Sequence, residues 1–96
     1  MGLYRISIPP HVASLCAHLP PTIKRDAKQA LRILAEDPHA GESLKRELTG
    51  LRKYRIRSFR IVYRLVTGRR LIQVMGIGPR STIYDMVRAF RRIPQR

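Results

Sequence analysis

Residues 53–66, KYRIRSFRIVYRLV, alternate bulky apolar side chains with arginines and decide the fold expected for this chain. Alternation of this kind is typical of strands with one buried face, and the break at 57–58 indicates a tight hairpin. The run RRLIQVMGI at 69–77 follows a Thr-Gly break and has the same β-rich composition. The three runs, at 53–57, 59–66 and 69–77, together predict an antiparallel meander.

Pairing these strands through their turns predicts their register and faces. The expected pairs are Ile56 with Phe59, Tyr54 with Ile61, Arg55 with Arg60, Tyr63 with Ile72, and Ile61 with Val74. The predicted core face carries Tyr54, Ile56, Phe59, Ile61, Tyr63, Leu65, Ile72 and Val74. The opposite face is expected to hold Arg55, Arg60, Arg64 and Gln73, with Val62, Leu71 and Met75 between them. Facing like charges destabilise a sheet by up to about 1 kcal/mol, so an anion such as phosphate would relieve the pair of Arg55 and Arg60.

The rest of the chain predicts helices around this meander. The expected elements are a strand at 4–8, helices at 11–19 and 23–34 with Thr22 as N-cap of the second, a connector at 39–52 with one helical turn, and a helix at 81–93. The predicted class is α+β, with an N-terminal strand and helical hairpin packed on the antiparallel meander and a short C-terminal helix. We expect a single domain over 1–96, because this length suffices for one hydrophobic core.

The charge of the chain is strongly one-sided. Its 96 residues include 20 lysines and arginines against 6 aspartates and glutamates, which gives a formal net charge of +14. Residues 1–47 carry 7 basic and 5 acidic residues, whereas 48–96 carry 13 basic residues and Asp85 alone. A surface of one sign repels itself and concentrates anions, so the composition favours a polyanionic partner such as nucleic acid.

Other kinds of chemistry have little support in the sequence. Cys16 is the only cysteine and the carboxylates are scattered, so neither a metal nor another cofactor is expected. His11 and His18 share a helix face but stand about 10 Å apart, too far for both to contact one phosphate. No apolar run is long enough to cross a bilayer and the N-terminus lacks a signal core, so we expect no membrane association and a cytoplasmic location.

Two stretches give the sequence a recognisable pattern: LKRELTGLRKYRIRSFRIVYRLV at 44–66 and VMGIGPRSTIYDMV at 74–87. Their order and spacing resemble the RelE/ParE superfamily of toxins from bacterial type II toxin-antitoxin pairs, over nearly the whole chain. The resemblance implies a compact α+β fold and a partner antitoxin, in a toxin-antitoxin hetero-oligomer. An acidic, amphipathic antitoxin would cover the charge and the exposed Val62, Leu71 and Met75.

Function divides within this superfamily. RelE-like members cut messenger RNA in the ribosomal A site, whereas ParE-like members poison DNA gyrase. The arginines and the tyrosine of the RNA-cleaving branch have counterparts in Arg60, Arg80 and Tyr84, so the sequence favours a ribosome-dependent mRNA endoribonuclease acting in the 70S ribosome. A gyrase inhibitor working by protein contact and a non-catalytic RNA-binding module remain the alternatives.

The resemblance also implies roles for individual residues in a metal-free attack of a ribose 2′-hydroxyl on the adjacent phosphate. Arg60 and Arg80 would stabilise the phosphorane, because guanidinium groups stay charged and donate paired hydrogen bonds. Tyr84 would accept the proton, since nearby positive charge favours its phenolate form. The residues expected to hold the RNA backbone are Lys53, Arg55, Arg57, Arg64, Arg88 and Arg91.

Overall fold

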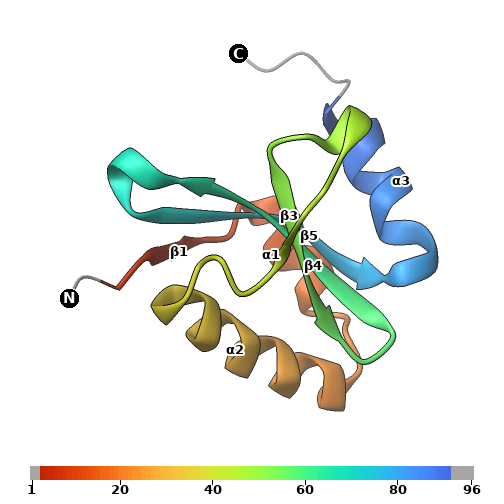
Figure 1. Cartoon of the computed structure of the whole chain (residues 1–96). Helices are drawn as coiled ribbons and strands as arrows, with labels where there is room; N and C mark the ends of the chain where they lie inside the picture. The colour runs from red at the N-terminus through yellow and green to blue at the C-terminus, as the bar shows by residue number, and fades with distance from the viewer. Residues whose placement is uncertain (1–2, 92–96) are drawn as a thin grey trace.

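A five-stranded sheet with helices on both faces forms the framework of the chain (Figure 1), in a computed structural model that describes residues 3–91 and side chains as far as Phe90. The strands are β1 (Arg5–Ser7), β2 (Glu42–Ser43), β3 (Leu51–Ile56), β4 (Phe59–Val66) and β5 (Leu71–Pro79). The helices are α1 (Pro10–Cys16), α2 (Pro21–Glu36) and α3 (Arg80–Arg91), with 3₁₀ turns η1 (Arg46–Leu48) and η2 (Thr67–Arg69). The predicted α+β class is confirmed.

The strand order is β1-β5-β4-β3-β2, so the predicted meander forms the centre of the sheet. The sheet is antiparallel except at one edge, where β1 runs parallel to β5 with Ile6 beside Ile72. The strand β1, which precedes the helices, therefore pairs with the last strand of the meander. Within the described residues, no helix has the length and hydropathy needed to cross a membrane.

The first hairpin has the predicted register and the second does not. Ile56 pairs with Phe59, as expected, but Tyr63 pairs with Val74 instead of Ile72. The second turn uses four residues rather than two, since η2 is followed by Arg70 in the left-handed region at φ 48°. The resulting shift of two residues leaves every side chain near this turn on its predicted face, because side chains alternate with period two.

A β-bulge at Met75 changes this alternation farther along β5. Val62 pairs with Gly76 and Tyr63 with Val74, so Met75 is the extra residue. As a result Ile77 lies on the same face as Val74, and Gly76 lies on the other. A Cβ at Gly76 would come within 3.0 Å of Cδ1 of Ile83, so the glycine lets α3 approach the sheet closely.

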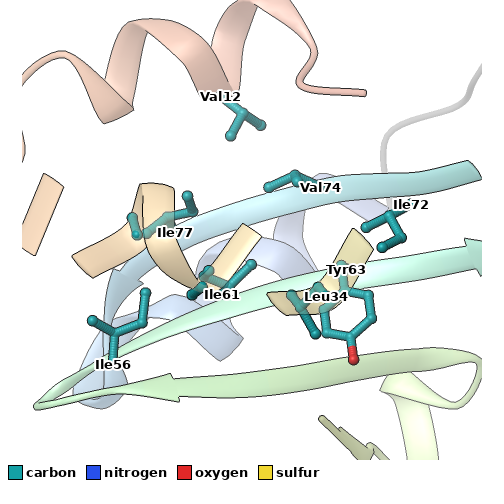
Figure 2. Packing of buried hydrophobic residues seen from close by; sticks show 10 residues of the cluster. Val12, Leu34, Ile56, Ile61, Tyr63, Ile72, Val74 and Ile77 are labelled. Carbon is teal, nitrogen blue, oxygen red and sulfur yellow. The ribbon is translucent and has the colours of Figure 1, made fainter. Parts of the chain in front are cut away.

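Helices α1 and α2 cover one face of the sheet and enclose the larger hydrophobic core. Val12 of α1 and Leu34 of α2 meet strand residues such as Ile61 and Val74 (Figure 2). All eight residues predicted for the core face belong to this cluster or pack against it. Thr22 is not the N-cap of α2: the helix starts at Pro21, two residues earlier than predicted, and the fixed φ and missing N–H of proline suit the first helical position.

Helix α3 covers the other face, where the sequence suggested exposed apolar residues. Val62 is 0% exposed and packs with Ile83 and Val87 of α3 and with Leu48 and Leu51. The expectation that Val62 is exposed and available to an antitoxin is therefore wrong, because α3 packs over this face of the sheet and buries the side chain. Of the other residues expected to be exposed, Leu71 and Met75 are half-buried.

The hydroxyl of Tyr63 joins the core to the segment that leads into β2. It accepts a hydrogen bond from the Gly41 N–H at 3.2 Å and donates one to the Pro38 carbonyl at 2.9 Å, and Tyr63 is 0% exposed. Tyr63→Phe leaves these buried groups without this partner, so we expect it to lower the free energy of unfolding by about 1–3 kcal/mol. Urea unfolding measures the loss. Equal midpoints for Tyr63→Phe and a Tyr4→Phe control would contradict the bridging role.

Candidate functional site

The turn between β3 and β4 is held in an unusual conformation by α2. Arg57 has φ 54°, in the left-handed region that costs a non-glycine residue about 1–2 kcal/mol. Its Nε lies 2.6 Å from Oδ2 of Asp26 in α2, and this ion pair fixes the side chain at the tip of the hairpin. The turn therefore has a defined position relative to the helical layer.

The start of α3 lies beside the same turn. The backbone N–H of Arg80 donates a hydrogen bond of 2.8 Å to the carbonyl of Ser58. Pro79 ends β5 directly before the helix, and the chain changes from strand to helix within one residue. Because the N-terminal end of a helix is electropositive, this junction adds positive potential to the nearby arginines.

A pocket of about 660 Å³, here called the arginine pocket, opens between this turn and the start of α3. Its lining residues come from β3, the turn, β4 and α3: Arg55, Arg57, Ser58, Arg60, Pro79, Arg80, Ser81 and Tyr84. Tyr84 lies one turn into α3 and is half-buried against the apolar cluster beneath that helix. The pocket thus places a tyrosine next to a concentration of guanidinium groups.

Arg60 and Arg55 are neighbours in the lining of this pocket. They pair directly across β4 and β3, as the sequence predicted. Nη1 of Arg60 donates hydrogen bonds to the carbonyls of Phe59 at 2.8 Å and Arg57 at 3.1 Å, which orient the guanidinium along the turn. Arg80 is exposed and lines the same pocket. A dianionic phosphate group would neutralise these facing charges.

Lys53 lies beside the arginine pocket rather than in it. It lines a neighbouring pocket that shares Arg55 and Arg60 with the first, and its Nζ stands 3.7 Å from Oε1 of Glu42. The chain therefore offers two adjoining hollows with the pair of Arg55 and Arg60 between them.

The other predicted backbone-binding residues are placed elsewhere. Arg64 lines a groove near the start of α1 and the end of α3, away from the arginine pocket. Arg88 is engaged with acidic residues: its Nη1 lies 2.7 Å from Oδ1 of Asp85, and its Nε lies 3.7 Å from Oε1 of Glu47. Arg91 ends α3, and its side chain lies outside the described residues.

Histidine and cysteine side chains lie apart from the arginine pocket. His11 and His18 are both exposed. The ring of His11 stacks on Phe90, with centroids 4.6 Å apart. Burial raises the pKa of the Cys16 thiol, and the positive charge of Lys24 acts in the opposite direction. Between residues 3 and 91, no group of three or more His, Cys, Asp or Glu side chains could hold a metal ion.

Three polar residues that line or support the arginine pocket were not identified from the sequence. Ser81 follows Arg80 directly, and Ser58 lies in the predicted hairpin turn, so their positions alone could have indicated both. Asp26 is different, because its contact with Arg57 spans 31 residues of sequence and depends on how α2 packs.

Solved structures of a class of small toxins share this fold. The structure resembles the RelBE2 toxin-antitoxin complex of Mycobacterium tuberculosis, with a TM-score of 0.75 and 24% identity over 84% of this chain and 95% of that chain. It also resembles a mutant of Escherichia coli RelE in the free state, with a TM-score of 0.74 and 18% identity over 97% of this chain and 100% of that chain. The archaeal RelE-RelB complex of Pyrococcus horikoshii gives a TM-score of 0.69 and 24% identity, over 83% of this chain and 98% of that chain.

Sequence comparison places the chain within this class. Its residues 6–84 match the family model of the ParE toxin of the type II toxin-antitoxin system parDE, and the chain belongs to that family. A search of curated protein sequences finds no match. The chain thus belongs to the ParE family by sequence and has a fold that solved RelE structures share.

Proposed function

We propose that this toxin cleaves messenger RNA on the ribosome. The observation that carries the proposal is the arginine pocket, in which Arg60, Arg80 and Tyr84 meet although they come from different elements. Guanidinium groups beside a hydroxyl, in a pocket open to solvent, are groups that phosphoryl transfer without a metal can use.

The proposed reaction begins with attack of a ribose 2′-oxygen on the neighbouring phosphorus. Tyr84 accepts the proton of the 2′-hydroxyl, while Arg60 and Arg80 stabilise the negative charge that gathers on the phosphorane oxygens. The bond from phosphorus to the 5′-oxygen then breaks, and that oxygen takes a proton from water. The products are a 2′,3′-cyclic phosphate and a new 5′-hydroxyl.

The ribosome supplies what the isolated toxin lacks in this proposal. The arginine pocket is open and Arg55 and Arg80 are exposed, so a free strand could bind in many orientations. In-line attack needs the 2′-oxygen, the phosphorus and the leaving oxygen to be aligned, and a message held in the A site has restricted freedom. In this proposal Lys53, Arg55 and Arg57 hold its backbone on either side of the reacting phosphate.

We also propose an antitoxin partner for this chain. The M. tuberculosis and P. horikoshii structures are toxin-antitoxin complexes, and the formal charge of +14 favours an acidic protein. Because α3 already buries Val62, this residue is not free to bind an antitoxin through apolar contacts. The argument for the partner is therefore attraction between opposite charges. An antitoxin that neutralised the positive charge of the arginine pocket would block the proposed cleavage of RNA.

Inhibition of DNA gyrase is a second candidate, favoured by the match of residues 6–84 to the ParE family model. This activity works through protein contact and needs no reacting group in the arginine pocket. A gyrase inhibitor would slow supercoiling by purified gyrase and leave a message intact, and these two results separate the candidates.

The deciding experiment is primer-extension mapping of a defined message in a reconstituted translation reaction. We expect the wild-type toxin to produce cuts in phase with the codons, and to produce none when ribosomes are omitted. An intact message together with blocked supercoiling would replace the nuclease proposal with the gyrase one.

A further inference from the structure

The turn between β3 and β4 connects three of the arginines that line the arginine pocket. Arg57 lies at its tip, and the backbone carbonyl of Arg57 accepts a hydrogen bond of 3.1 Å from Nη1 of Arg60. The next carbonyl, that of Ser58, accepts the 2.8 Å hydrogen bond from the backbone N–H of Arg80. The orientation of the Arg60 guanidinium and the position of the start of α3 therefore both depend on the conformation of this turn.

Arginine is an unfavourable residue for that conformation. The loop consists of Arg57 and Ser58, since Ile56 pairs with Phe59, and Arg57 has φ 54°. Two-residue hairpin loops that need a positive φ at the first position favour glycine, asparagine or aspartate there. A strained backbone conformation of this kind persists only where the surrounding structure holds it. A contact from outside the turn must therefore hold Arg57.

Asp26 of α2 makes this contact. Its Oδ2 lies 2.6 Å from Nε of Arg57, and the side chain of Asp26 is 30% exposed. The carboxylates of the other ion pairs between residues 3 and 91 are from 61% to 80% exposed. Water and salt screen a less exposed pair less strongly. Ala27, the next residue of α2, is buried in the larger core, so the carboxylate projects from a rigid helix.

We propose that Asp26 is a positioning residue for the arginine pocket. By holding Arg57 in its left-handed conformation, Asp26 sets the turn that orients Arg60 and places Arg80. The inference rests on the proposed cleavage of RNA. Asp26 is not among the residues that line the arginine pocket, so it acts through the turn and not by contact with the substrate.

Asp26→Ala in single-turnover cleavage on programmed ribosomes, with toxin in saturating excess, tests the proposal. The rate should fall by about 10- to 100-fold, because a misplacement on the order of 1 Å can cost a reaction this much. Ribosome affinity should stay equal or increase, since a carboxylate near a phosphate site repels RNA. The rate at saturation does not depend on the folded fraction of the toxin, so partial unfolding cannot mimic this result.

Two further variants separate geometry from charge. Glu36→Ala removes an exposed carboxylate from the same helix, away from the arginine pocket, and should cleave at the wild-type rate. Adding Arg57→Gly to Asp26→Ala supplies a residue that adopts a positive φ freely, so the double variant should cleave faster than Asp26→Ala alone. An unchanged rate in Asp26→Ala, or a double variant that is no faster, would overturn the proposal.

Hydrogen exchange of the Arg80 amide tests the same contact without requiring cleavage. In Asp26→Ala this amide should exchange faster by about threefold or more, the effect of losing one charge-assisted hydrogen bond, while amides in the centre of β4 keep their protection. Unchanged exchange at Arg80 would show that the turn does not depend on Asp26. If the wild type leaves every message intact, the nuclease function is rejected, and exchange alone decides whether Asp26 holds the turn.

Discussion

Replacing Arg60 with alanine is expected to slow message cleavage by about 10²- to 10³-fold, the usual loss when one donor to a developing oxyanion is removed. Arg60 is oriented toward the arginine pocket by its hydrogen bonds to the carbonyls of Arg57 and Phe59. Single-turnover cleavage on programmed ribosomes measures the effect, because it isolates the chemical step from product release.

Two further variants identify the cause of that loss. Arg69→Ala removes the same charge from η2, at the far end of β4, and should cleave at the wild-type rate. Arg60→Lys keeps the charge but loses the paired donors, so it should recover only part of the activity. If Arg60→Ala cut as fast as Arg69→Ala, Arg60 would have no part in the chemistry, and the reduced net charge alone would explain any weaker binding.

The second large effect is expected from Tyr84→Phe, which should lower the cleavage rate by about 10²- to 10⁴-fold. The substitution removes only the hydroxyl oxygen, and the ring keeps its contacts with the apolar cluster under α3. Because the hydroxyl acts on the proton of the attacking group, ribosome binding should change little. Cleavage and ribosome affinity are measured on the same preparation.

Tyr4→Phe provides the comparison, since Tyr4 packs against the larger core on the α1 and α2 side of the sheet. It should cleave normally. Matching losses of cleavage and of ribosome affinity in Tyr84→Phe would assign the residue to binding, and full activity would remove it from the proposed reaction.

Local sequence patterns predicted most of the fold. The alternation in 53–66 gave both the hairpin and its faces, because each strand buries one side over several residues. The second register could not be obtained in this way, since it depends on a four-residue turn with Arg70 in the left-handed region. The pairing of β1 with β5 was not predicted either, because it joins two strands that lie far apart in the sequence and leaves no local pattern.

The candidate site followed the same division between local and distant information. Arg55 and Arg60 could be placed together from the hairpin alone, and Arg80 and Tyr84 from their spacing at the start of a helix. The ion pair of Arg88 with Glu47 required knowledge of where η1 meets α3, whereas its pair with Asp85 lies within one helical turn. Charge counts could not separate a guanidinium in the pocket from one that holds two elements together.

The β-bulge at Met75 has a consequence for comparing this chain with its relatives. Before the bulge, side chains at even positions of β5 point toward α1 and α2, and after it those at odd positions do. An alignment gap moved by one residue within 74–77 would match Ile77 to a glycine and exchange the two faces. Relatives should therefore be aligned so that the residues facing α3 match Gly76 and Gly78 of this chain, which keeps the position of Arg80 in register.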